Sequence, residues 1–91
     1  MFKIKDFSNR ILNRRDLNRR DLNGANVSRS RIIKSKFKFA DLKRVSFKLS
    51  HIVDTKFRYL KIWGASFKGA FLKNVSFLSS DLDLSNVELV V

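Results

Sequence analysis

The sequence predicts an all-β solenoid in which the chain turns at a fixed short interval and successive turns stack. Two observations carry this prediction. Every fifth residue from Phe2 to Val87 is apolar, although the whole chain is only 44% apolar, and the position two residues earlier is nearly always small from Ala25 onward. A period of five fits neither the roughly 3.6 residues of a helical turn nor the period of about 2 of a strand. Such repeats bury their apolar side chains by stacking on their neighbours.

The apolar position is expected to form the core of the solenoid, and the small position to point inward beside it. The regular part of this central ladder consists of Leu22, Val27, Ile32, Phe37, Leu42, Phe47, Ile52, Phe57, Ile62, Phe67, Leu72, Phe77, Leu82 and Val87.

The central ladder alternates between an aliphatic residue and Phe from Ile32 to Leu82. An alternation with a period of ten residues closes on itself only if each coil has an even number of sides. With four sides, every layer holds two rings and two aliphatic side chains, which keeps the core volume constant from coil to coil. The rings then form two stacks on opposite sides, one with Phe37, Phe57 and Phe77, the other with Phe47 and Phe67.

The repeating units read ANVSR, ADLKR, VSFKL, ASFKG, VSFLS, SDLDL and SNVEL, among others. This pattern of a small residue, Asn or Asp, Leu or Phe and two mostly polar residues resembles the pentapeptide-repeat family over about residues 15–89. The resemblance implies a right-handed quadrilateral β-helix with four units per coil and about four and a half coils in all.

The N-terminal end departs from the pattern, because Lys5, Arg10, Arg15 and Arg20 occupy the small position. Such long cations do not fit a narrow interior, so we expect either a distorted first coil or a cap formed by residues 1–14. Residues 13–23 are interpreted as the first, irregular coil. The chain has no Pro and only three Gly residues, so no linker is evident and residues 1–91 are expected to form one domain.

The charge is strongly unbalanced, with a formal net charge of +12 and no Lys or Arg after Lys73. A basic surface favours nucleic acid, an acidic protein face or an anionic membrane without choosing among them. No apolar run approaches the roughly 20 residues that span a bilayer. The basic N-terminus leaves organelle targeting open, with the cytoplasm as the default location.

Catalysis has little support in this sequence, and no metal or cofactor is expected. His51 is the only histidine and falls on an outward position, Cys is absent, and no phosphate-binding glycine loop is present. Acids before the central residue are expected to shape the coil surface rather than to act as general acids or bases. These acids are Asp16, Asp21, Asp41 and Asp81.

In a four-sided coil, outward residues that are twenty positions apart lie on the same face. The face centred on Phe37 and Phe57 then carries several cations and two aromatic rings. Basic groups beside rings are typical of nucleic-acid binding. The alternative is a solvated face on which the rings pack against Lys and Arg stems. The candidate partner or polyanion site comprises Arg19, Lys36, Lys38, Phe39, Lys56, Arg58 and Tyr59.

Other large apolar residues also fall on outward positions, and clusters of such residues mark interfaces. They are Ile33, Leu49, Val53 and Trp63. An uncovered solenoid end also invites pairing with another chain. Leu89, Val90 and Val91 are therefore candidates for an end-on homodimer or partner contact, unless they fold back over the last coil.

Three functions follow from these features. The first is a non-catalytic interaction or structural module that binds an acidic or amphipathic partner protein, within a larger complex or alone. The second is a nucleic-acid-binding protein, whose affinity falls steeply with salt. The third comes from the family resemblance, which includes topoisomerase-protecting proteins that imitate the shape and negative charge of DNA. The charge of +12 has the wrong sign for that role.

Overall fold

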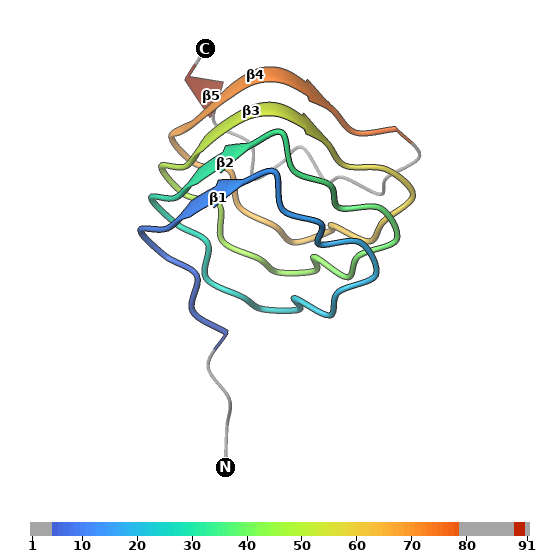
Figure 1. Cartoon of the computed structure of the whole chain (residues 1–91). Coiled ribbons are helices and arrows are strands. Elements are labelled where there is room, and N and C mark those ends of the chain that lie inside the picture. The colour runs from blue at the N-terminus through green and yellow to red at the C-terminus, as the bar shows by residue number, and fades with distance from the viewer. Residues whose placement is uncertain (1–4, 79–88, 91) are drawn as a thin grey trace.

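The strands of the chain form one parallel sheet whose spatial order follows the sequence, β1-β2-β3-β4-β5 (Figure 1). The computed structural model describes residues 5–78 and the backbone of 89–90. Within these residues there is no helix, so the all-β prediction is confirmed. The strands are β1 Ile11–Asn13, β2 Arg31–Ile33, β3 His51–Lys56, β4 Ala70–Ser76 and β5 Leu89–Val90.

Successive coils pair with an offset of twenty residues. Ile11 lies beside Arg31, Arg31 beside His51, and His51 beside Phe71. The same offset recurs in isolated bridges around the coil, for example from Lys36 to Lys56. One turn of the described coils therefore takes twenty residues. The last pairing is one residue shorter, because Ala70 lies beside Leu89.

A left-handed residue turns the chain every five residues. Gly24, Gly64 and Gly69 take this conformation readily, whereas the other residues accept a conformation that L-amino acids disfavour. Stacking of neighbouring coils therefore holds a strained backbone at each of these corners. The positive φ angles fall on Asn9, Arg14, Arg19, Gly24, Arg29, Lys34, Phe39, Arg44, Leu49, Asp54, Tyr59, Gly64, Gly69 and Asn74.

The residue before the central position supports the same turn. A carboxylate oxygen of Asp16 accepts the backbone N–H of Asn18 at 3.0 Å, and Asp21 accepts that of Asn23 at 3.1 Å. These are local side-chain to backbone bonds of the kind that short acidic and amide residues make in turns. The carboxylates of Asp16 and Asp21 therefore support the turn that follows them.

The central ladder from Leu22 to Phe67 is buried, and Leu72 and Phe77 are half-buried near the C-terminal end. Phe37 and Phe57 stack with ring centroids 4.9 Å apart and ring planes within 13°. The stack continues to Phe77 at 5.1 Å, while the opposite stack joins Phe47 to Phe67 at 4.9 Å. Rings of the two stacks meet edge to face, a favoured geometry for aromatic pairs.

The small position also connects neighbouring coils. The Ser30 hydroxyl donates to the carbonyl of Phe7 at 2.7 Å, and Ser50 donates to Val27 at 2.8 Å. Ser30 and Ser50 are fully buried, so these bonds satisfy hydroxyl groups that would otherwise be costly inside the core.

The described N-terminal coil does not have the irregularity that was expected. It pairs with the second coil in the common register from Asp6 onward, where Asp6 lies beside Asn26. The expectation assumed a closed interior, but no described coil lies beneath this one. Arg10, Arg15 and Arg20 are consequently exposed while their backbone remains regular.

Several predicted residues lie outside the described part of the chain. Leu82, Val87 and Val91 are among them, as are the side chains of Leu89 and Val90. The backbone of Leu89–Val90 pairs with β4 as the last strand of the sheet. No described helix is long and apolar enough to cross a membrane.

Candidate interaction face

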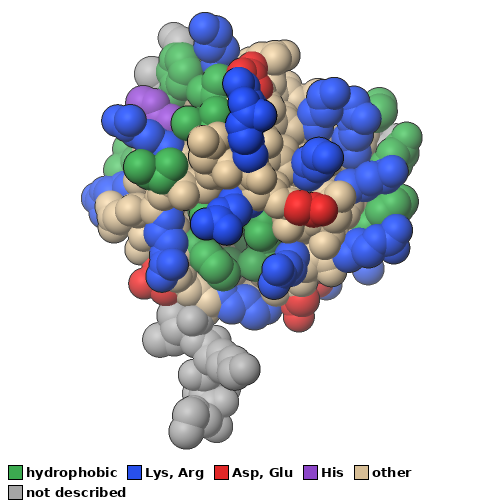
Figure 2. Space-filling view, viewed as in Figure 1, with side chains coloured by type: hydrophobic (Ala, Val, Ile, Leu, Met, Phe, Trp, Pro, Cys, Tyr) green, Lys and Arg blue, Asp and Glu red, His purple; other side chains and the backbone are tan. Residues whose placement is uncertain are grey.

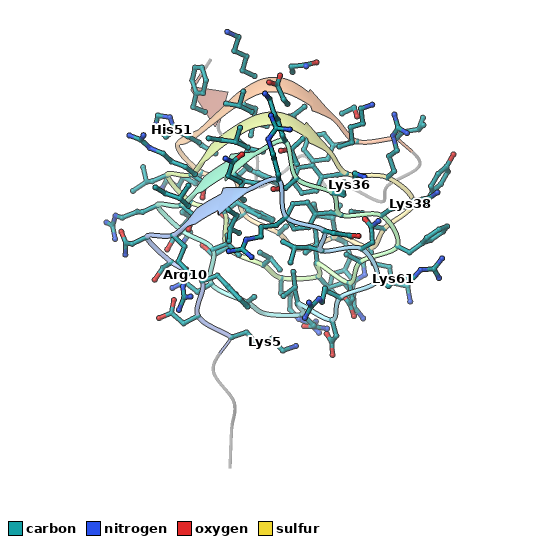
Figure 3. All side chains as sticks on the ribbon, viewed as in Figure 1. Lys5, Arg10, Lys36, Lys38, His51 and Lys61 are labelled. Carbon is teal, nitrogen blue, oxygen red and sulfur yellow. The ribbon has the colours of Figure 1, made fainter. Side chains whose placement is uncertain are left out.

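The seven residues of the predicted site lie on one side of the coil and come from three successive turns. We call Arg19, Lys36, Lys38, Phe39, Lys56, Arg58 and Tyr59 the basic-aromatic face. Lys36 and Lys56 are bridge partners in adjacent coils. The backbone N–H of Arg19 donates to the carbonyl of Lys38, and that of Phe39 donates to Arg58. Lys36 and Lys38 lie on one side of the coil, with His51 on the other (Figure 3).

The two rings of this face stack on one another. The centroids of Phe39 and Tyr59 are 5.6 Å apart and their planes differ by 23°. The guanidinium of Arg19 lies 5.2 Å from the Phe39 centroid, and the ammonium of Lys38 lies 5.5 Å from Phe39 and 5.9 Å from Tyr59. Phe39 remains 49% exposed and Tyr59 45% exposed. Both rings therefore offer apolar surface while they already contact cations.

A surface pocket of about 340 Å³ lies beside the rings, lined by Asn18, Lys36, Phe37, Lys38, Lys56 and Arg58. Its four cations form no ion pair with any carboxylate of the described residues. The Arg58 Nε is buried and has no hydrogen-bond partner there.

The sequence missed a second cluster of the same composition. Trp63 is 42% exposed, and its ring has Arg44 at 4.9 Å and Lys43 at 5.6 Å. Lys43 and Trp63 are twenty residues apart, which is the length of one coil, so this spacing could have predicted their contact from the sequence. Arg44 comes from the coil below, where its side chain passes close to Gly64.

The remaining outward residues do not join the basic-aromatic face. His51 is exposed and tilts over the ring of Phe71 at 5.5 Å. Ile33 and Val53 are half-buried partners in adjacent strands, and Leu49 is 51% exposed. Among the described residues, no group of three His, Cys, Asp or Glu could hold a metal ion.

The charged surface has few internal pairs. Figure 2 shows Lys and Arg spread over one side of the molecule with few acidic side chains among them. In the described part of the chain, the ion pairs join Lys5 to Asp21 at 3.2 Å and Lys43 to Asp41 at 3.7 Å. The hydrogen bond from the Asn23 backbone and the pairing with Lys5 lower the pKa of Asp21. Hydrogen bonds from the side chain and backbone of Ser8 lower the pKa of Asp6.

The five-residue repeat also matches a known family of proteins. The family profile described as Pentapeptide repeats matches residues 6–48 in eight copies. No curated protein has significant sequence similarity to the chain.

Solved structures show the same fold along most of the chain. A pentapeptide repeat protein from the thylakoid lumen of Arabidopsis thaliana is 19% identical, with a TM-score of 0.56, over 92% of this chain and 71% of that one. QnrB1, a plasmid-mediated fluoroquinolone resistance protein, is 22% identical with a TM-score of 0.53, over 85% and 44%. HetL, involved in heterocyst differentiation regulation in Nostoc sp. strain PCC 7120, is 15% identical with a TM-score of 0.50, over 90% and 48%.

The chain is thus a parallel β-solenoid of stacked five-residue units. Its residues 6–48 match the pentapeptide-repeat profile, and solved pentapeptide repeat proteins share its fold, so the resemblance predicted from the sequence is confirmed. It spans less than half of the length of QnrB1 and of HetL.

Proposed function

We propose that this protein is a non-catalytic interaction module whose basic-aromatic face binds an acidic partner protein. The single observation that carries the proposal is the group of four cations around the pocket that pair with no described carboxylate, beside two half-exposed rings. Lys36 and Lys56 are neighbours across adjacent coils and repel one another. A carboxylate-bearing partner relieves this repulsion and forms charge-assisted hydrogen bonds with the cations of the pocket.

The arrangement of the rings favours a protein partner over stacked bases. Phe39 has Tyr59 against its ring at 5.6 Å and the Arg19 guanidinium at 5.2 Å. A base that stacked on Phe39 would have to displace one of them, whereas single-strand binding depends on accessible ring faces. Apolar side chains of a partner need only the exposed parts of the rings, which is how aromatic residues contribute at protein interfaces.

We propose with this that residues 1–91 act as one domain and that its coil is right-handed and four-sided, with about four and a half turns. The twenty-residue register supports four units per turn. A rigid rod suits a binding role, because stacked repeats present their outward side chains in fixed rows. The net charge of +12 opposes the negative surface that imitation of DNA needs.

A direct titration tests the proposed function. The probes are a labelled peptide rich in Glu and Leu and a labelled single-stranded oligonucleotide of equal charge, both measured by fluorescence anisotropy. The test variant combines Lys36→Glu, Lys38→Glu, Lys56→Glu and Arg58→Glu. The control variant reverses the same number of exposed charges elsewhere, at Arg29, Lys48, Lys61 and Lys68.

We expect the peptide to bind the wild type and to lose at least about tenfold in affinity in the test variant but not in the control. Tighter binding of the oligonucleotide, lost in the same variant, would establish the nucleic-acid alternative instead. Equal losses in both variants would show that only net charge matters, which contradicts a defined site. Circular dichroism of each variant checks that the fold is retained.

A further inference from the structure

The N-terminal end of the solenoid is an open pocket. Its volume is about 230 Å³, and it is lined by Phe7, Arg10, Leu12, Arg15, Leu17, Arg20, Leu22, Val27 and Phe37. Phe7, Leu12 and Leu17 are half-buried, whereas their equivalents one coil higher are buried. The apolar layer at this end of the described coils is therefore only partly covered.

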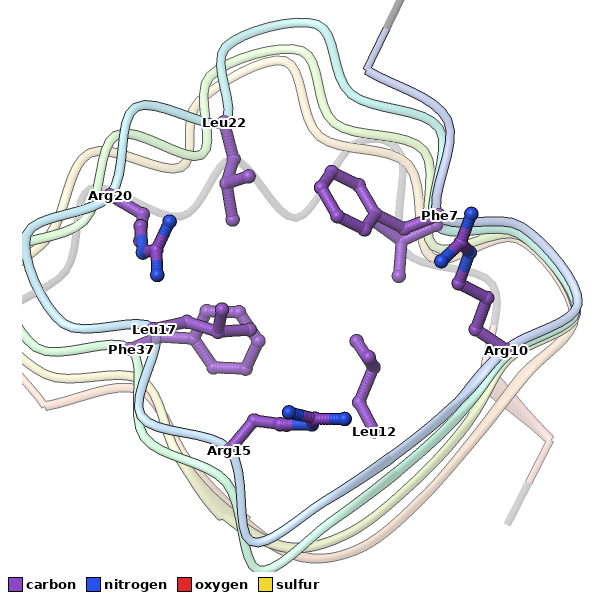
Figure 4. Close-up of a pocket in the computed structure, with 9 residues that line it drawn as sticks. Phe7, Arg10, Leu12, Arg15, Leu17, Arg20, Leu22 and Phe37 are labelled. Atoms are coloured by element: carbon purple, nitrogen blue, oxygen red, sulfur yellow. The ribbon is translucent and has the colours of Figure 1, made fainter.

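Three arginines reach over this apolar layer. Arg10, Arg15 and Arg20 point from the wall into the opening around Phe7, Leu12, Leu17 and Leu22 (Figure 4). The Arg10 guanidinium lies 5.9 Å from the Phe7 centroid. None of the three arginines pairs with a carboxylate of the described residues. The pocket thus combines an apolar floor with guanidinium groups that no described carboxylate neutralises, which suits a surface with acidic and apolar side chains.

The backbone edge at this end is also open. The N–H groups of Arg31, Lys36 and Asp41 donate to the coil below, at Arg10, Arg15 and Arg20. The equivalent N–H groups of Ile11 and Asp16 have no coil beneath them in the described part of the chain. An open row of strand groups is a template for another chain. The shape that fits it is the upper edge of another coil of this repeat, since each coil already pairs with the next in that way.

The opposite end of this same chain has the complementary chemistry. β5 is the last strand of the sheet, and its outer edge faces no described strand. The sequence from residue 79 to 91 contains Asp81, Asp83 and Glu88, no Lys or Arg, and six apolar residues. Opposite charge joins these two ends, whereas two N-terminal ends would bring six arginines together.

We propose that the N-terminal pocket binds the C-terminal end of a second copy of this chain, so that copies join head to tail. Arg10, Arg15 and Arg20 pair with the acidic residues of the partner copy, and β5 of that copy continues the parallel sheet below β1. The contact uses two different surfaces, so it does not close on itself and adds copies in a row. It is separate from the basic-aromatic face and does not depend on the function proposed for that face.

Two variants of the full chain test this contact, each blocked at one end. The first carries Arg10→Glu, Arg15→Glu and Arg20→Glu, and the second carries Asp81→Lys, Asp83→Lys and Glu88→Lys. A control reverses the exposed Arg29, Lys48 and Lys68. Sedimentation velocity is measured at 0.15 M salt, where screening over about 8 Å limits repulsion between whole molecules. Circular dichroism and thermal melts establish that each variant is folded.

We expect the wild type and the control to form a series of dimers and longer species as concentration rises. Each blocked variant alone remains a monomer, while an equimolar mixture of the two associates again, because one junction is intact and the reversed charges at the other two ends are complementary as well. A dimer formed by the first variant alone would overturn the proposal, because it would show tail-to-tail pairing. A wild type that stays monomeric at all concentrations, or a mixture without dimer, would overturn it as well.

Discussion

The ring of Phe39 lies stacked on the ring of Tyr59 from the next coil, with centroids 5.6 Å apart, although both residues are turn residues with positive φ. The central ladder places phenylalanines above one another inside the solenoid, and the same twenty-residue register repeats this arrangement outside. The outer stack therefore follows from the coil geometry, while the exposure of about half of each ring makes it available to a partner.

A double-mutant cycle on Phe39 and Tyr59 measures this stack. We expect Phe39→Ala and Tyr59→Ala to be coupled by about 0.5–1.5 kcal/mol in the free energy of unfolding, the usual range for an aromatic pair. Urea unfolding of the two single variants and the double variant gives the value. Strictly additive effects would mean that each ring packs on the cations and not on its neighbour.

The inner stacks should matter far more for stability. Phe57 is fully buried between Phe37 and Phe77, with centroid distances of 4.9 Å and 5.1 Å. Phe57→Ala should lower the free energy of unfolding by about 3–5 kcal/mol. Phe7→Ala is the matched control, because Phe7 holds the equivalent type of position but is half-buried in the end coil. Chemical denaturation should show a loss less than half as large for Phe7→Ala, and equal losses would contradict an open N-terminal end.

The period of five and the alternation of Phe with aliphatic residues were sufficient to predict the solenoid, its inward positions and the stacking of Phe37 over Phe57. They could not predict the left-handed backbone conformation that turns the chain at every fifth residue. Most positive φ angles fall on residues such as Arg29, Lys34 and Leu49, which carry no local signal for this conformation. The turn is imposed by the pairing of whole coils, and pairing is a property of the assembled stack.

The same limit explains the errors at the N-terminal end. Four cations at the small position indicated a distorted coil, because the pattern says which way a side chain points but not whether a layer lies beneath it. The grouping of Lys36, Lys38, Lys56 and Arg58 was predictable from the twenty-residue spacing alone. The contact of Arg44 with Trp63 could not be predicted in this way, because the two residues come from different coils and hold different positions in the five-residue unit.

Acid should weaken the fold through the lowered pKa of Asp21. The carboxylate accepts the Asn23 backbone N–H and pairs with Lys5, so its pKa in the folded state lies below the ordinary value of 3.8. The unfolded chain binds more protons in this range, so the contribution is complete above that ordinary value and is lost as pH falls through the folded pKa. Asp21→Asn keeps an oxygen that can accept the Asn23 N–H but cannot titrate.

Thermal melts from about pH 5 down to about pH 2 check this expectation. The melting temperature of the wild type should fall in the lower part of this pH range. The melting temperature of Asp21→Asn should fall less over the same range. Asp54→Asn serves as the control, because Asp54 accepts a hydrogen bond from the Asn74 side chain and not from its own turn. Identical pH dependence for the wild type and Asp21→Asn would contradict a role of this carboxylate in the folded state.

Ala substitutions at Gly24 and Gly69, two corners of the coil, distinguish the cost of backbone strain from the cost of side-chain crowding. Gly24 and Gly69 have nearly the same φ, +73° and +70°, so Ala at either position carries a similar strain of about 1 kcal/mol. A Cβ on Gly24 would meet no atom within 4 Å, whereas one on Gly69 would lie 2.7 Å from the Cδ2 of Leu49. Gly69→Ala must therefore also displace the Leu49 side chain.

We expect Gly69→Ala to destabilise the protein more than Gly24→Ala does, by roughly 0.5–1.5 kcal/mol, the range for an off-rotamer side chain. In a Leu49→Ala background the two substitutions should become equivalent, because the crowding atom is gone while the strain remains. Urea midpoints of the four variants decide the matter. If Gly69→Ala remained the more destabilising substitution in the Leu49→Ala background, crowding by the Leu49 side chain could not be the cause. The difference would then come from the backbones of the two coils at this corner.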